Sequence, residues 1–239
     1  MSRKIVIAHL YPREMNIYGD LGNIATLVKR LEWRGYETEV RTVEIGEPFD
    51  FAQVDIAFGG GGQDRGQLIV GPDLQLRGED VRQAVQAGLP ALVICGLYQL
   101  FGRGFTTASG QDIPGIDVFR ATTVGGDTRM IGNIVLDSDF GRLVGFENHS
   151  GETILEPEQA PLGRVVKGYG NSTKGRYEGA VTRNAIGTYL HGPILPKNPI
   201  LADHLILTAL RRRFGDVQLA ALDNSREQAA AKTAISRPR

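Results

Sequence analysis

The sequence predicts an α/β fold built on a mainly parallel sheet that helices cover on both faces. Strand-like and helical patterns alternate through the first hundred residues, which is typical of parallel strands joined by helical crossovers. The run Ala91–Ile94 is continuously aliphatic and is bounded by Pro90 and Gly96, as expected for a strand buried on both faces. After Gly102 the pattern changes to short strands with frequent glycine, which indicates appended antiparallel strands.

The first half of the chain contains the expected parallel core. A first strand is predicted at Lys4–His9, and from Leu21 apolar residues recur with a helical period until Gly35 ends the helix. The next elements are strands at Glu37–Val43 and Val54–Phe58, a helix near Gly78–Gly88, the strand Ala91–Ile94, and a helix that begins with Leu97–Phe101. Sites collect in the loops that follow parallel strands, so the segments after these strands are the ones to search.

The second half of the chain contains shorter elements and ends in a tail. Short strands are predicted at Phe119–Val124, Gly132–Leu136, Leu143–Glu147 and Arg164–Lys167, followed by an apolar strand at Ala185–Leu190 and a helix at Pro199–Phe214. We therefore expect one domain over residues 1–215. Residues 216–239 are polar and rich in alanine, which predicts a flexible C-terminal tail.

The composition is that of an ordinary globular protein. Of 239 residues, 41% are hydrophobic, and 27 basic residues balance 27 acidic ones, so no charge excess favours a nucleic-acid partner. The single cysteine excludes an internal disulfide and a cysteine-based metal cluster, and no metal site is expected. No apolar run is long enough for a signal-peptide core or a transmembrane segment, so a cytoplasmic location is predicted.

The only cysteine, Cys95, stands where the buried strand meets the following helix. At such a turn the helix N–H groups and the positive end of the helix dipole lie near the sulfur and favour the nucleophilic thiolate. The alternative is that Cys95 is a small buried hydrophobic residue, as free cysteines often are. Its position alone leaves both interpretations open.

A histidine stands at a second strand end. His191 follows Ala185–Leu190, so a candidate nucleophile and a candidate base both lie where a parallel sheet opens its cleft. His149 also follows a strand and is a second candidate for a site contact, although a histidine is often only hydrogen-bonded within the fold. His9 and His204 are expected to be structural.

Four consecutive glycines, Gly59–Gly62, follow another predicted strand. Their N–H groups could form an anion nest for a phosphate, but the run lacks the Gly-Lys-Ser/Thr ending of a P-loop and the spacing of a dinucleotide fingerprint. An oxyanion hole fits better, because a glycine strand beside Cys95 can bring N–H donors within about 3 Å of a tetrahedral oxygen.

Five segments together resemble a known family. They are Leu10–Pro12 with Asn16–Asp20 and Gly22-Asn23, Gly59–Asp64, Cys95-Gly96 with Tyr98-Gln99, Gly145–His149, and Tyr189–Pro193. Each segment is weak alone, but their order over residues 10–193 resembles the class I (triad-type) glutamine amidotransferases, in the branch that includes the glutaminase domains of cobyric acid synthases. Most closely it resembles the glutaminase subunits of lipid II isoglutaminyl synthases. The resemblance implies a flavodoxin-like fold and glutamine as the substrate.

The resemblance also implies a role for each candidate residue. Cys95 would be the nucleophile and His191 its base. Gly96, together with Gly60 or Gly61, would supply the oxyanion N–H groups. Arg129 would bind the α-carboxylate of the substrate glutamine. Gln99, Asn148 and His149 would line the pocket around the same glutamine. Arg129 could instead be a solvated loop charge, but a free amino acid needs a carboxylate clamp and arginine supplies a bidentate one.

One position departs from the family pattern. Many class I members have a glutamate two residues after the catalytic histidine, and here that position is Pro193. We therefore expect no carboxylate of this chain to orient His191, which leaves a Cys-His dyad or a triad completed from elsewhere. The resemblance implies the second arrangement, with an aspartate of a Mur-ligase-like partner of the MurT type, so the isolated chain should be a poor glutaminase.

By the same resemblance, the chain hydrolyses glutamine and delivers ammonia to that partner within a heterodimer. ATP and Mg²⁺ would belong to the partner, and no cofactor is expected in this chain. The partner would amidate the D-glutamate α-carboxylate of the lipid II stem peptide at the inner face of the membrane. The alternatives are a glutaminase for another ATP-dependent amidation of the cobyric acid type, and a non-catalytic binding member of the same fold.

Overall fold

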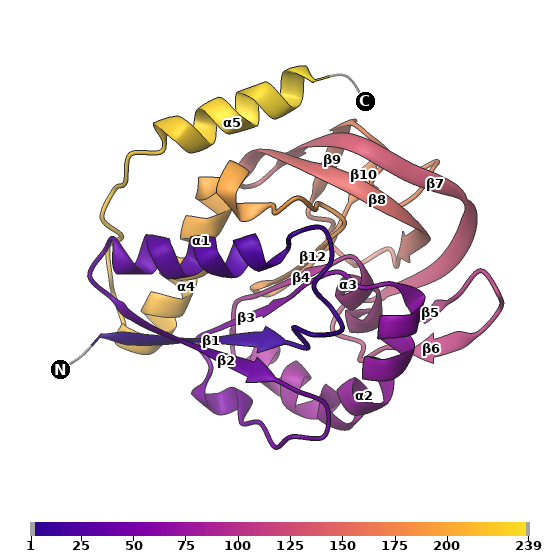
Figure 1. Ribbon diagram of the computed structural model, residues 1–239, viewed down its shortest axis with the longest axis horizontal. Coiled ribbons are helices and arrows are strands. Elements are labelled where there is room, and N and C mark those ends of the chain that lie inside the picture. Colours follow the sequence, from indigo (N-terminus) through magenta and orange to yellow (C-terminus); the bar gives the residue numbers. More distant parts are fainter. Residues whose placement is uncertain (1–2, 238–239) are drawn as a thin grey trace.

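A six-stranded sheet forms the centre of the computed structural model, which describes residues 3–237 (Figure 1). Its strand order is β11-β12-β4-β3-β1-β2, and all neighbours are parallel except β11 and β12. The strands are β1 (Lys4–Leu10), β2 (Glu37–Val43), β3 (Ile56–Gly59), β4 (Ala91–Ile94), β11 (Ala180–Thr182) and β12 (Ala185–Thr188). Every residue of β3, β4 and β12 is buried, which confirms the prediction of central strands covered on both faces.

Helices lie on both faces of this sheet (Figure 1). α1 (Leu21–Glu32) and α4 (Pro199–Phe214) pack together on one face, and α2 (Asp64–Gln86) and α3 (Gly96–Phe101) pack together on the other. In α1, the apolar residues Ile24, Leu27 and Leu31 recur at helical spacing and are buried in the core. No helix within residues 3–237 combines the length and the apolar character that a bilayer span needs.

The chain leaves β1 and β3 toward opposite faces of the sheet. β1 leads to α1, whereas its neighbour β3 leads to α2. Such a switch point opens a crevice at the carboxyl ends of adjacent parallel strands. Cys95 follows β4, which is the next strand of the sheet, and His191 follows β12 beyond it. Four neighbouring strand ends therefore converge on one region.

A second sheet meets the first near His191, whose backbone pairs with Phe146 in an isolated bridge. Its order is β10-β9-β7-β5-β6, with β8 paired to β7. The strands are β5 (Gly104–Thr106), β6 (Asp112–Pro114), β7 (Ala121–Ser138), β8 (Gly141–Leu155), β9 (Gly163–Lys167) and β10 (Tyr177–Glu178). The sequence predicted short strands, but β7 and β8 are 18 and 15 residues long and pair with each other. Their length was hidden because a register shift between Gly125 and Met130 interrupts the alternation.

Helix α2 is longer than the helix predicted near residues 78–88, because it already begins at Asp64. Pro72 and three internal glycines obscure its helical pattern, since both residue types are unfavourable in a helix interior. Packing overrides that preference. The buried apolar side chains of α2 are Val70, Leu74, Val81, Ala84 and Val85.

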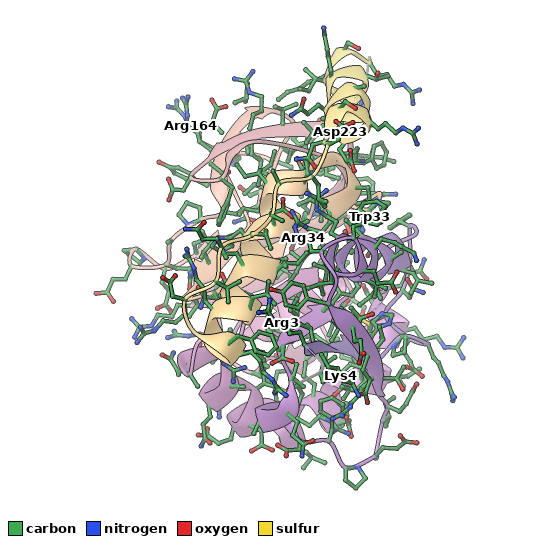
Figure 2. All side chains as sticks on the ribbon, turned by 90° about the vertical axis from the view of Figure 1, so that its left-hand side faces the viewer. Arg3, Lys4, Trp33, Arg34, Arg164 and Asp223 are labelled. Carbon is green, nitrogen blue, oxygen red and sulfur yellow. The ribbon has the colours of Figure 1, made fainter. Side chains whose placement is uncertain are left out.

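The C-terminal tail, which the sequence predicts to be flexible, contains a helix. Residues 216–239 follow the end of α4, as predicted, but α5 (Ser225–Ser236) forms within them, while residues 238 and 239 lie outside the described range. Figure 1 shows α5 running along the outside of the molecule. Figure 2 looks onto the neighbouring face, where Arg34 lies beside α4.

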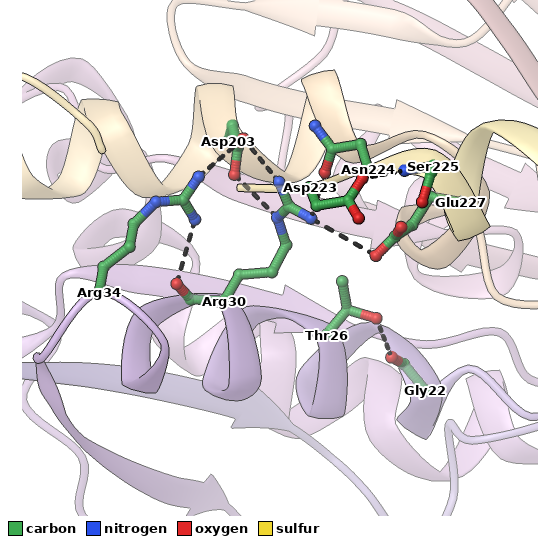
Figure 3. Close-up of polar contacts among 9 residues, drawn as sticks. All are labelled: Gly22, Thr26, Arg30, Arg34, Asp203, Asp223, Asn224, Ser225 and Glu227. Atoms are coloured by element: carbon green, nitrogen blue, oxygen red, sulfur yellow. Dashed lines mark hydrogen bonds and ion pairs between the residues drawn. The ribbon is translucent and has the colours of Figure 1, made fainter. Parts of the chain in front are cut away.

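A buried arginine of α1 joins these helices (Figure 3). Arg30 donates two hydrogen bonds to the carboxylate of Asp203 in α4, at 2.8 and 2.7 Å, and a third to Asn224 at 2.9 Å, directly before α5. Glu227 of α5 lies 3.7 Å from the same guanidinium. These partners lie far from Arg30 in sequence, so no local pattern could reveal that the tail is held in place.

Candidate active site

Cys95 stands on a strained turn between β4 and α3. Its backbone has φ +48° and ψ −105°, a conformation that non-glycine residues rarely adopt, and its N–H donates to the Thr188 carbonyl of β12 at 2.8 Å. The residue is buried but lines a cavity, and Gly96 begins the following helix. The predicted strand-to-helix turn at the cysteine is therefore confirmed.

His191 is held beside this turn by its own backbone and by an aromatic neighbour. Its N–H and C=O exchange hydrogen bonds of 2.8 and 3.2 Å with Phe146 of β8. The ring of Tyr18 meets the imidazole edge-on, with 4.9 Å between the ring centroids. The imidazole is 0% exposed and is not itself part of the cavity lining.

A carboxylate of this chain lies against His191, so the expectation that none would do so is wrong. The two oxygens of Asp20 are 3.4 and 3.3 Å from Nδ1 of His191, and both side chains are 0% exposed. The sequence argument considered only the position two residues after the histidine. Asp20 comes from 171 residues earlier, at the start of α1, where an aspartate is normally interpreted as a helix cap.

The charges around His191 keep its imidazole protonated at neutral pH. Burial lowers the pKa of His191, but the nearby charge of Cys95 and the contact with Asp20 outweigh burial and raise the pKa to about 10. An imidazolium beside the sulfur stabilises a thiolate. His191 is therefore placed as a proton donor beside the candidate nucleophile Cys95.

The glycine run takes part in the site with a different assignment of its members. The Gly61 N–H donates to Asp20 at 2.7 Å and so is not free to bind an oxyanion, and a Cβ on Gly60 would meet the Met15 carbonyl, outside the cavity. Gly62 instead lines the cavity with Cys95. A Cβ on Gly96 would lie only 3.0 Å from the Gly62 nitrogen, so the two backbones approach each other closely. Gly62 and Gly96 thus bring glycine backbone together beside Cys95, while the oxyanion roles of Gly60 and Gly96 stay predictions.

A cavity of about 370 Å³ opens beside the cysteine. Its lining includes five of the residues singled out in the sequence, which are Cys95, Gln99, Arg129, Asn148 and His149. Tyr18, Gln67 and Asp64 complete much of the wall, and Asp64 is the only carboxylate among the lining residues. The volume is sufficient for a small amino acid rather than for a large substrate.

Arg129 reaches this cavity from the irregular part of β7, between the two paired stretches of the hairpin. Its Nε donates to Asn148 Oδ1 at 2.7 Å and its Nη2 to the Tyr18 hydroxyl at 3.2 Å. Within residues 3–237, Nη1 makes no hydrogen bond to protein. The guanidinium is thus fixed on one side and open on the other, which is suited to an anion in the cavity.

His149 and Gln99 form an ordered wall rather than an acid-base group. The imidazole of His149 stacks on Tyr189 with centroids 3.6 Å apart, and its Nδ1 lies 2.9 Å from the Gly151 carbonyl. Burial lowers the pKa of His149 to about 3, so the ring is neutral. The Gln99 amide donates to the Tyr189 hydroxyl at 3.1 Å and accepts from Gln67 at 2.7 Å.

The remaining two histidines lie outside the cavity. His9 is buried against Phe58 in the sheet, and His204 of α4 packs against Phe140. Both keep the structural role that the sequence predicted. Within residues 3–237, no three side chains of His, Cys, Asp or Glu are grouped so that they could hold a metal ion.

With a cysteine on a strained turn, a buried histidine that a carboxylate contacts, and glycine backbone close to the cysteine, the site has the parts of an amide hydrolase with a cysteine nucleophile. Residues 6–199 match the model of the CobB/CobQ-like glutamine amidotransferase domain, and the chain belongs to that family.

Two relatives match over nearly the whole chain. It is 37% identical over 235 residues to the lipid II isoglutaminyl synthase (glutamine-hydrolyzing) subunit GatD of Staphylococcus aureus, which covers 98% of this chain and 96% of the relative. It is 42% identical over 230 residues to the GatD subunit of Streptococcus pneumoniae, covering 95% and 88%. A probable cobyric acid synthase of Methanosphaera stadtmanae is 31% identical over 128 residues, which is 47% of this chain and 25% of that protein.

Solved structures agree on the fold. A crystal structure of a glutamine amidotransferase superposes with a TM-score of 0.59 at 14% identity, over 84% of this chain and 98% of the other. The predicted α/β fold and the predicted family are thus both confirmed, and the cobyric acid synthases are distant relations.

Proposed function

We propose that this chain is the glutaminase subunit of a lipid II isoglutaminyl synthase. The observation that carries the proposal is that Cys95, on its strained turn, lines a cavity together with Arg129 and lies near enough to the buried His191 for their charges to interact. The near full-length similarity to two GatD subunits supports this substrate assignment over a cobyric acid-type amidation. A non-catalytic binding role is disfavoured, because it gives no reason for a strained cysteine next to an imidazolium.

Glutamine binds with its polar backbone groups away from the sulfur. The open side of the Arg129 guanidinium takes the α-carboxylate, and Asp64 is the carboxylate of the cavity wall available to the α-ammonium group. The side-chain amide then reaches Cys95, and its oxygen lies toward the N–H groups of Gly62 and Gly96. Gln99, Asn148 and His149 shape this pocket.

The reaction proceeds through a thioester. The Cys95 thiolate attacks the carboxamide carbon, and the oxyanion N–H groups stabilise the charge on its oxygen. The carbon–nitrogen bond breaks as the His191 imidazolium gives its proton to the departing amide nitrogen, which leaves as ammonia. Water then attacks the glutamyl thioester, His191 takes a proton from that water, and glutamate and the thiolate are released.

The ammonia passes to a second subunit. We infer that this partner is a MurT-like Mur ligase in a heterodimer, that it binds ATP and Mg²⁺, and that it amidates the D-glutamate α-carboxylate of lipid II. This chain then works in the cytoplasm, at the inner face of the membrane, and reaches the lipid only through its partner. The names of the relatives support a multi-subunit synthase, and the finer assignments belong to the proposal.

The test is an amidation assay of the complex with the Cys95→Ala variant. Glutamine-dependent amidation should fall at least about a thousandfold, because the nucleophile is gone, while ammonium chloride at high concentration should still support the partner. Cys95→Ser controls for the size of the side chain. Glutamine-dependent amidation that persists in Cys95→Ala would overturn the assignment of the nucleophile.

A further inference from the structure

We propose that Gln67 determines specificity in the cavity, and that its side-chain oxygen accepts a hydrogen bond from the carboxamide N–H of glutamine. The inference rests on the proposed glutaminase reaction and adds a residue to it. Gln67 lies in the first turn of α2, and no pattern in the sequence singled it out. Through this contact the site distinguishes glutamine, which is an amide, from its product glutamate, which is an acid.

The protein fixes the orientation of the Gln67 amide. Its Nε2 lies 3.1 Å from the carbonyl oxygen of Gly96 and 2.7 Å from Oε1 of Gln99. A peptide carbonyl can only accept, so the atom that faces Gly96 is the nitrogen, and both of its hydrogens are used. Gln99 is oriented in turn, because its Nε2 donates to the Tyr189 hydroxyl at 3.1 Å. The Gln67 amide therefore cannot turn over without losing both hydrogen bonds.

The oxygen of the same amide has no partner in the protein. Within residues 3–237 no hydrogen bond reaches Oε1 of Gln67, although the residue is only 1% exposed. A buried acceptor without a partner is unfavourable, which makes it a candidate for a ligand contact. Protein atoms do not enclose this oxygen, and Gln67 lines the cavity beside Cys95. The cavity is therefore the space from which its partner comes.

Gln67 lies near the reacting end of the substrate. It contacts the carbonyl of Gly96, which directly follows the nucleophile, whereas Arg129 binds the α-carboxylate at the other end. In the proposed complex the carboxamide oxygen lies toward the glycine N–H groups, so the carboxamide nitrogen needs an acceptor elsewhere. Of the buried residues that line the described cavity, Gln67 and Gln99 alone have a side-chain oxygen. That of Gln99 already accepts from Gln67.

Such an acceptor favours the substrate over the product. The carboxamide of glutamine has two N–H donors, whereas the ionised carboxylate of glutamate has none. Against Oε1 of Gln67, a carboxylate oxygen would leave two acceptors facing each other without a hydrogen bond. A site built to hydrogen-bond one group of its substrate rejects an analogue that lacks this group. Gln67 thus keeps glutamate a weak inhibitor of the reaction that forms it.

The first experiment compares two substrates in the complex with the co-expressed partner, for the wild type and Gln67→Met. The γ-methyl ester of glutamate forms the same thioester as glutamine: its acyl carbon–oxygen bond breaks and methanol leaves. However, its reacting group has no N–H. We expect the ratio of kcat/KM for glutamine to kcat/KM for the ester to fall about tenfold in the variant. The lost contacts to Gly96 and Gln99 affect both substrates alike and cancel in this ratio.

The matched control is Gln83→Met, an exposed change on the same helix, which should leave the ratio at the wild-type value. The second measurement is competitive inhibition by glutamate. In Gln67→Met the KM for glutamine should rise, whereas the inhibition constant of glutamate should not, because its carboxylate no longer faces an oxygen. Arg129→Ala provides the contrast. It should raise both constants, since glutamine and glutamate have the same α-carboxylate.

The outcomes separate this role from the proposed function. Equal losses for glutamine and the ester in Gln67→Met, with the constants for glutamine and glutamate rising together, would overturn the specificity role and leave the glutaminase function intact. No glutamine hydrolysis by the wild-type complex would instead overturn the proposed function. If Gln67→Met does not fold, Gln67→Asn is judged by the same ratio, because it stays polar but withdraws the oxygen by one methylene.

Discussion

Arg129 shows how a single side chain determines the affinity for glutamine. It is exposed, and the sequence could not distinguish it from a solvated loop charge. The structure places its guanidinium in the cavity, with Asn148 and Tyr18 holding two of its nitrogens and the remaining side open. A guanidinium that is already oriented loses little rotamer freedom when it binds a carboxylate.

Replacing Arg129 by alanine should therefore weaken glutamine binding more than it slows the chemistry. A hydrogen bond to a charged group contributes about 1.5 to 3 kcal/mol, so KM should rise by about one to two orders of magnitude with kcat changed far less. Steady-state glutaminase kinetics measure both. Arg142→Ala, which removes an exposed arginine of β8 paired with Asp137, should have no effect. An unchanged KM in Arg129→Ala would return this residue to the loop-charge interpretation.

At the scale of elements, buried polar contacts of Arg30 connect the first helix, α1, to the last helix, α5. Arg30 is 1% exposed, and its bonds to Asp203 and Asn224 join α1 to α4 and to the segment before α5. Arg34 adds a hydrogen bond to the same Asp203 at 2.9 Å. No side chain of α5 is fully buried, so this helix depends on such contacts more than on an apolar face of its own.

Arg30→Met should lower the free energy of unfolding by about 3 kcal/mol, because it leaves the buried side of Asp203 with one fewer partner. Urea denaturation measures that loss. Hydrogen exchange should become faster at residues 225–236 before the rest of the chain opens, since their anchor is removed. Arg226→Ala, an exposed change on α5, is the matched control; an equal effect of the two variants would show that the buried cluster does not hold the helix.

At the scale of the whole molecule, a carboxylate beneath the site makes stability depend on pH. Glu178 is 0% exposed and accepts from the Tyr189 N–H at 2.6 Å and from the Thr188 hydroxyl at 3.0 Å, at the end of the strand that leads to His191. Burial raises the pKa of Glu178 to about 8, and these hydrogen bonds only partly oppose it. The folded state therefore binds this proton more tightly than the unfolded chain does.

The sign of the pH effect follows from that difference. The contribution of Glu178 to stability is fully present below about pH 4.5 and is lost as the pH rises toward 8. Relative to Glu178→Gln, which cannot ionise, the wild type should lose up to about 1.4 kcal/mol of unfolding free energy per pH unit in that window. Urea denaturation of both proteins from pH 4.5 to 8.5 tests this. If the free energy of unfolding changes with pH in the same way in both proteins, Glu178 does not titrate between pH 4.5 and 8.5.

The parts of the fold that were predicted correctly are those with a strong local pattern. The aliphatic run before Cys95, the helical period after Leu21 and the apolar strand before His191 each lie within one element, so periodicity alone identifies them. Helix α2, the long β7–β8 hairpin and α5 were missed or shortened. Glycine and proline weakened the local signal in α2, and a bulge weakened it in the hairpin, whereas α5 is polar and rich in alanine. Contacts with distant residues keep all three elements in place.

By itself the sequence determined the parallel α/β core, the cysteine on its strand-to-helix turn and a histidine at a nearby strand end, because these follow from order and periodicity along the chain. Only the tertiary structure decided which carboxylate meets His191, that the Gly61 N–H is bonded to that carboxylate, and that Arg129 lines the cavity. Asp20 and His191 are 171 residues apart and on different elements. Their contact depends on how those elements pack, and no pattern within either element contains that information.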